Sequence, residues 1–92
     1  MLRKRFIAKI HGRVQGIGFR FFAREAADEL GVVGYVRNMP DGGVEVLAEG
    51  DESRLAEFLR LLGEGPASAR VAGVDVSWEP PTDSYDGFFV KA

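Results

Sequence analysis

The chain has 92 residues, of which 46% are hydrophobic and 28% are charged, and its formal net charge at pH 7 is −2. This length has room for one modest hydrophobic core, so we expect residues 1–92 to form a single domain. The weakly acidic balance gives no positive field for nucleic acid or an anionic membrane, and the lack of cysteine excludes disulfides and thiolate chemistry.

The first part of the sequence predicts a strand followed by a helix. Residues 3–12 alternate between apolar and polar side chains, which is typical of a half-buried strand. Its apolar face consists of Phe6, Ala8 and Ile10. Residues 21–30 continue a helical pattern that ends at Gly31, a typical C-cap. The apolar stripe of this helix consists of Phe19, Phe22, Ala26 and Leu30.

A hairpin is predicted next. Residues 32–39 are rich in β-branched and aromatic side chains, and residues 44–50 alternate, with Val44, Val46 and Ala48 facing inward. The turn between these strands contains Pro40, whose φ is pre-set, and glycines at 42 and 43, either of which can adopt a positive φ.

A second helix and two more strands complete the pattern. Asp51 is placed to cap a helix whose apolar stripe consists of Leu55, Phe58, Leu59 and Leu62. Residues 69–79 predict a strand with an apolar face of Ala72, Val74, Val76 and Trp78. Residues 88–91 predict a short closing strand with Phe88 and Val90 on one face. The order β-α-β-β-α-β indicates a ferredoxin-like α/β sandwich (α+β), an antiparallel sheet with two helices on one face plus a short extra strand.

The segment "GRVQGIGFR", residues 12–20, joins the first predicted strand to the first helix. Its glycines at 12, 16 and 18 allow backbone conformations in which successive N–H groups turn into a concave, anion-binding nest. The loop leads into a helix N-terminus, which also favours anions, and Arg20 can grip two oxygens of a tetrahedral anion. Glycine content alone fits equally well a plain turn in which Arg20 pairs with a carboxylate such as Glu25.

The residue types that usually attack phosphorus are scarce. Cysteine is absent, and His11, the one histidine, is predicted on the face of its strand away from the core. The acidic residues are spread rather than clustered, so we expect no metal and no cofactor. The remaining candidate is Asn38, which ends the strand before the hairpin and whose amide can hold a water molecule without acting as a base.

Several segments in order resemble the acylphosphatase family: residues 12–20, "GYVRN", "PDGGVEVLAEGD", "GPASARV" and the closing "GFFV". The resemblance covers nearly the whole chain and implies metal-independent hydrolysis of acyl phosphates to a carboxylate and inorganic phosphate. It places the catalytic arginine at Arg20 and the catalytic asparagine at Asn38. The implied backbone cradle for phosphate consists of Gln15, Gly16, Ile17, Gly18, Phe19 and Arg20. Inorganic phosphate or sulfate should then compete with the substrate.

Three other interpretations remain open at this stage. A ferredoxin-like sheet can bind single-stranded RNA, although the acidic chain argues against a nucleic-acid partner. The chain can also be a domain that serves carbamoyl transfer in a larger protein, or a sensor of acyl phosphates. Because the pattern ends after its last strand, and no run reaches the about 20 apolar residues of a membrane span, we expect a free-standing, monomeric, cytoplasmic enzyme.

Amide side chains are unusually rare in this composition. The chain contains a single glutamine, Gln15, and a single asparagine, Asn38, while arginine outnumbers lysine nine to three. Such a composition fits a thermophilic origin, in which thermolabile amides are avoided, and equally a GC-rich genome. Both amides lie beside glycine-rich or turn segments, which hints that they belong to a site.

Overall fold

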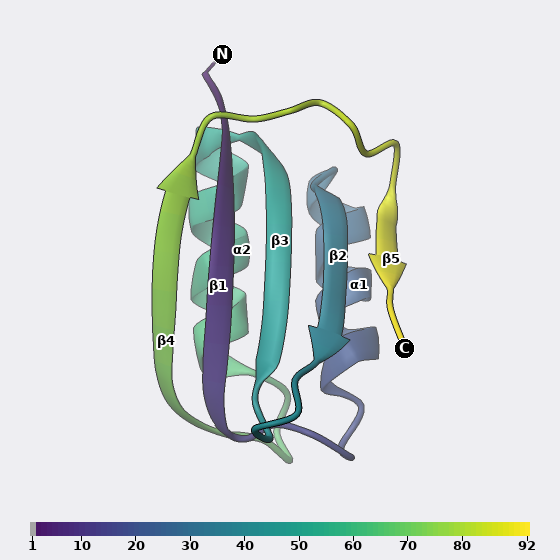
Figure 1. Ribbon diagram of the computed structural model, residues 1–92, viewed down its shortest axis with the longest axis vertical. Coiled ribbons are helices and arrows are strands. Elements are labelled where there is room, and N and C mark those ends of the chain that lie inside the picture. The colour runs from purple at the N-terminus through teal and green to yellow at the C-terminus, as the bar shows by residue number, and fades with distance from the viewer. Residues whose placement is uncertain (1) are drawn as a thin grey trace.

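The structure, a computed structural model that describes residues 2–92, consists of one five-stranded sheet with two helices packed on the same face (Figure 1). The strands are β1 (Arg3–Arg13), β2 (Val33–Asn38), β3 (Val44–Asp51), β4 (Arg70–Glu79) and β5 (Phe88–Val90). The helices are α1 (Phe19–Leu30) and α2 (Glu52–Glu64). The predicted ferredoxin-like order and the additional C-terminal strand are confirmed, but the sheet is mixed rather than wholly antiparallel, because β5 pairs parallel with β2. No helix within these residues is long and apolar enough to cross a membrane.

The strand order β4-β1-β3-β2-β5 determines which loops lie together. Strand β3 pairs antiparallel with both β1 and β2, so that Val44 lies opposite Ile10 on one side and opposite Asn38 on the other. Strands β1 and β2 therefore run in the same direction and end at the same edge of the sheet, the lower end in Figure 1. The loop after β1 and the turn after β2 consequently meet there.

The core lies between the sheet and the helices. The predicted inward residues Phe6, Ala8 and Ile10 have no exposed surface. The buried residues of the helices are Phe19, Ala23, Ala26 and Ala27 on α1, and Leu55, Phe58 and Leu62 on α2. The ring of Phe58 contacts those of Phe6 and Phe88 at centroid separations of 6.2 and 5.6 Å, which joins α2 to both halves of the sheet.

The prediction that Ala72 lies on the inward face of β4 is wrong, because a β-bulge shifts the register of this strand. Consecutive residues His11 and Gly12 pair with Gly73 and Val71, so Ala72 is an extra residue without a partner and is exposed. Val71 packs against the core in its place. Gly12 permits the irregularity, because its φ is +124° and a Cβ there would lie 2.1 Å from the Arg70 carbonyl oxygen.

Two further expectations need adjustment. Asp51 does occupy the N-cap position of α2, but its side chain makes no capping hydrogen bond and instead accepts one from the Ser53 hydroxyl at 2.9 Å. Strand β4 is an edge strand, so Trp78 keeps 46% of its surface exposed although its ring lies edge-on to Phe6 at 5.5 Å.

The central strand β3 is covered on both faces, which strict alternation did not predict. Its carboxylate at Glu49 is fully buried and accepts hydrogen bonds from the Thr82 N–H and hydroxyl at 2.9 and 3.0 Å and from the Asp83 N–H at 3.0 Å. Arg5 lies 3.5 Å away. Burial by itself raises the pKa of Glu49, but these hydrogen bonds and Arg5 outweigh it and hold the pKa below its ordinary value. Glu49 therefore anchors the β4–β5 connection to the sheet.

We expect Glu49→Gln to destabilise the fold by about 2–4 kcal/mol at pH 7, because an amide cannot accept hydrogen bonds from all of these donors. Since the pKa of Glu49 is lowered on folding, its contribution is complete above the ordinary glutamate pKa and is lost as the pH falls through the folded value. Urea unfolding between about pH 7 and 3 measures this dependence. The free energy of unfolding should fall less steeply with decreasing pH in the variant than in the wild type.

Glu57→Gln is the matched control. The pKa of Glu57 is also lowered, mainly by its hydrogen bond from Arg60, but the pair is solvent-exposed and should contribute little to stability. Equal acid dependence in Glu49→Gln and wild type would contradict the anchoring role of Glu49.

Candidate functional site

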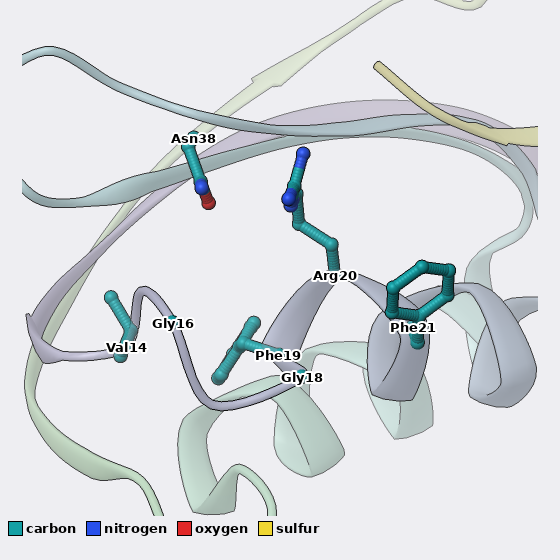
Figure 2. A pocket seen from close by; sticks show the side chains of 7 residues that line it. All are labelled: Val14, Gly16, Gly18, Phe19, Arg20, Phe21 and Asn38. Atoms are coloured by element: carbon teal, nitrogen blue, oxygen red, sulfur yellow. The ribbon is translucent and has the colours of Figure 1, made fainter. Parts of the chain in front are cut away.

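The loop between β1 and α1 and the C-terminal end of β2 enclose a small hollow of about 70 Å³. Its lining residues, shown in Figure 2, are Val14, Gly16, Gly18, Phe19, Arg20, Phe21 and Asn38. Both predicted catalytic residues, Arg20 and Asn38, thus lie at one hollow. Of the other predicted cradle residues, Gly16, Gly18 and Phe19 line it, whereas Gln15 and Ile17 do not.

The backbone of the loop alternates in handedness. Gly16 and Gly18 have φ values of +75° and +81°, whereas Gln15, Ile17 and Phe19 have negative φ. Alternation of this kind turns successive N–H groups toward one side, which is the geometry of an anion-binding nest. The side chains of Ile17 and Phe19 pack with the core, so these two residues can offer only their backbone to a ligand.

The N–H groups at this end of α1 have no hydrogen-bond partner in the described part of the chain. Within residues 2–92, those of residues 15–21 donate no hydrogen bond, and the first one of the helix runs from the Phe22 N–H to the Gly18 carbonyl at 3.0 Å. The first turn of α1 also contains no acidic residue. The positive end of the helix is therefore uncompensated and is available to an anion.

Arg20 adds a full positive charge beside the hollow. It forms no ion pair within the described part of the chain, so the alternative pairing with Glu25 is absent from the structure. Its Nη1 donates to the Lys91 carbonyl at 3.2 Å, and the Lys91 N–H in turn donates to the Val36 carbonyl at 2.9 Å. The chain after β5 thus holds the guanidinium near β2, and nothing in the sequence pattern pointed to Lys91.

Asn38 lies across the hollow from Arg20. It is the last residue of β2, and Figure 2 shows its side chain directed toward the space between the strand and the glycine loop. Among residues 2–92 its side-chain amide has no hydrogen-bond partner, so its donor and acceptor atoms are available to a ligand or a water molecule.

Gln15 has a second role that the sequence reasoning missed. Its Nε2 donates to the carbonyls of Met39 and Gly43, both at 2.8 Å, and so joins the glycine loop to the turn after β2. Gly42, with a φ of +95°, supplies the positive φ expected of that turn. The rarity of amide side chains was the one available signal for the Gln15 contact.

His11 lies apart from the hollow. Its Nε2 is 2.8 Å from an oxygen of Asp75 on the neighbouring strand β4, and it does not line the site. Residues 2–92 contain no cluster of three or more histidine or acidic side chains that could hold a metal ion.

The fold and site define a small ferredoxin-like protein with anion-binding geometry where β1 meets α1. The acylphosphatase family model matches residues 6–90, and the chain belongs to that family. It is 48% identical over 88 residues to the acylphosphatase of Salinibacter ruber, an alignment that covers 96% of this chain and 93% of the relative. As an acylphosphatase the chain is a hydrolase.

Solved structures agree with this assignment. The acylphosphatase from Bacillus subtilis superposes with a TM-score of 0.93 at 32% identity, over 97% of this chain and 99% of that one. T. kodakarensis HypF also contains this fold, with a TM-score of 0.84 at 32% identity, but the match covers only 12% of that longer chain.

Gly18→Ala should damage anion binding more than it damages folding. A Cβ at Gly18 would meet no atom within 4 Å, so the strain comes only from the positive φ and costs about 1–2 kcal/mol. Relief of that strain would rotate the adjacent N–H groups and weaken inorganic phosphate binding by about tenfold, the equivalent of one charge-assisted hydrogen bond. Isothermal titration calorimetry would measure the change.

Gly31→Ala is the matched control, because Gly31 caps the opposite end of the same helix with a φ of +69° and an equally open Cβ position. Each variant should lower the melting midpoint by about 4–8 °C per kcal/mol. Only Gly18→Ala should weaken phosphate binding, and equal weakening in both variants would contradict the cradle.

Proposed function

We propose that this acylphosphatase binds the phosphoryl group of its substrate in the backbone cradle from Gln15 to Arg20, with the Arg20 guanidinium on the same group. Asn38 would hold the water molecule that attacks phosphorus. The observation that carries the proposal is a convergence of groups at one hollow. Within residues 2–92, the N–H groups of residues 15–21 and the Asn38 amide have no hydrogen-bond partner, and Arg20 forms no ion pair.

The chemistry of an acyl phosphate suits such a site. The substrate is a mixed anhydride whose leaving group, a carboxylate, is a weak base and departs without a general acid. Phosphoryl transfer through a loose transition state needs stabilisation of the equatorial oxygens and alignment of the attacking and leaving oxygens. Fixed backbone N–H groups and a guanidinium supply the stabilisation without reorganising during the reaction.

Water alignment is the proposed role of Asn38. An amide can accept a hydrogen bond from the water and donate another, which orients an oxygen lone pair without removing a proton. The proton would pass to a phosphate oxygen of the substrate. The same reasoning predicts that the reaction needs no metal and that phosphate or sulfate competes with the substrate.

We further propose that residues 1–92 act as one monomeric domain. The alignment with the Salinibacter ruber acylphosphatase, which spans nearly all of both chains, supports the proposal that this domain is sufficient for hydrolysis. The second candidate is service as a domain of a larger protein, which the likeness to T. kodakarensis HypF favours. Turnover of an acyl phosphate by the purified chain alone distinguishes the two.

Arg20→Ala should lower kcat/KM for benzoyl phosphate, measured in EDTA, by at least about 10²–10³, because a fixed charge on the transferring group is removed. Arg20→Lys should recover only part of this loss, since lysine keeps the charge but not the two-pronged geometry. A variant Arg20→Ala that retained more than about a third of wild-type activity would contradict the assignment.

Arg24→Ala provides the control for a change in helix charge. Arg24 lies one turn later on α1, with its guanidinium 5.4 Å from the ring centroid of Phe21 and outside the lining of the hollow. Its removal should change kcat/KM by less than about threefold, as for an ordinary surface substitution.

Asn38→Ala should lower kcat far more than it weakens inhibition by inorganic phosphate, because the amide is proposed to hold water rather than the anion. We expect a loss of about 10²-fold in kcat, comparable to a misaligned reactant, with the phosphate inhibition constant nearly unchanged. Steady-state kinetics with phosphate as competitor measures both quantities. If kcat and phosphate inhibition weakened by the same factor, Asn38 would be a structural residue instead.

A further inference from the structure

No hydrogen bond within residues 2–92 fixes the Asn38 side chain. The position of its amide therefore follows the position of its backbone. On one side its backbone is held by pairing with Val44, and on the other it continues directly into the turn of residues 39–43. Any movement of that turn would therefore move the amide.

The turn itself is closed by few contacts. The Met39 N–H donates to the Gly43 carbonyl at 2.8 Å, and the Gly42 N–H donates to the Met39 carbonyl at 3.1 Å. Gln15 adds two more hydrogen bonds, from the same Nε2 to the carbonyls of Met39 and Gly43, each 2.8 Å long. Both protons of the Gln15 amide are thus used on the two residues that close the turn.

Gln15 also belongs to the glycine loop, since its backbone immediately precedes Gly16. One residue therefore contacts both halves of the site, the loop through its main chain and the turn after β2 through its side chain. The side chain is partly buried, and these two bonds are the only hydrogen bonds that it makes within residues 2–92.

We propose that Gln15 is a positioning residue that sets the distance between the phosphate cradle and the Asn38 amide. The inference rests on the proposed roles of the cradle and Asn38. A reacting water must be placed within a fraction of an ångström, and a displacement of about 1 Å can cost about 10² in rate. A double donor that spans the loop and the turn maintains this placement.

The chemistry of the contact restricts which side chains can perform it. Two carbonyl oxygens converge on one atom, so that atom must carry two protons. Methionine has similar length but no donor. Glutamate has nearly the same shape, but when ionised it presents an oxygen to two carbonyls and can make neither hydrogen bond.

The first test is a double-mutant cycle with benzoyl phosphate. Gln15→Met should lower kcat by about 10-fold or more, while the phosphate inhibition constant changes by less than about threefold. In the Asn38→Ala background the same substitution should change kcat by less than about threefold, because its effect acts through Asn38. Gly31→Ala controls for lost stability, since it strains α1 far from the hollow.

The second test uses pH. Gln15→Glu should be impaired at neutral pH and should regain activity relative to the wild type as the pH falls. A protonated carboxyl can donate one of the two hydrogen bonds, and its neighbouring carbonyl oxygens raise the pKa of the introduced group. Gln15→Met should show no such recovery.

Two results would overturn the proposal. If Gln15→Met lowered kcat by the same factor in the Asn38→Ala background as in the wild type, Gln15 would not act through Asn38. A phosphate inhibition constant that rises in step with the fall in kcat would make Gln15 part of the anion grip. Absence of turnover in the folded wild type would instead refute the proposed function, and the positioning role with it.

Discussion

The site depends on the pairing of β3 with both of its neighbours. Because β1 and β2 are each antiparallel to β3, they run in the same direction and deliver their following loops to the same edge of the sheet. The glycine loop and Asn38 are separated by about one helix and one strand of sequence, yet this arrangement brings them to the same hollow. The buried faces of β3 thus do more than fill the core, since they hold the two halves of the site in register.

Positive charge and hydrogen-bond donors gather at the hollow. The N–H groups of residues 15–21, the positive end of α1 and Arg20 lie near it. The first turn of α1 contains no acidic residue, and Arg20 forms no ion pair within residues 2–92. The loop is held in place from beneath by the buried side chains of Val14 and Phe19, while Gly16 and Gly18 stay exposed to solvent.

Local patterns predicted most of the fold and several of the residues that line the hollow. Helical spacing identified Phe19 and Ala26 on the buried face of α1, whereas Phe22 and Leu30 are only half-buried and Ala23 and Ala27 were missed. Alternation identified Phe6, Ala8 and Ile10, and the glycine loop pointed to Arg20. The errors arose where distant strands meet. Ala72 is exposed because a bulge against Gly12 shifts the register of β4. Leu47 and Glu49 are buried because other parts of the chain cover the second face of β3.

The sequence by itself determined the elements, most of their inward faces and a glycine-rich loop before α1, because these follow from residue periodicity and from the conformations that glycine permits. Only the tertiary structure decided the partners: Lys91 for Arg20, Thr82 and Asp83 for Glu49, and the turn after Asn38 for Gln15. Each of these contacts joins segments far apart in the chain. Their geometry comes from strand order and register, which no local pattern encodes.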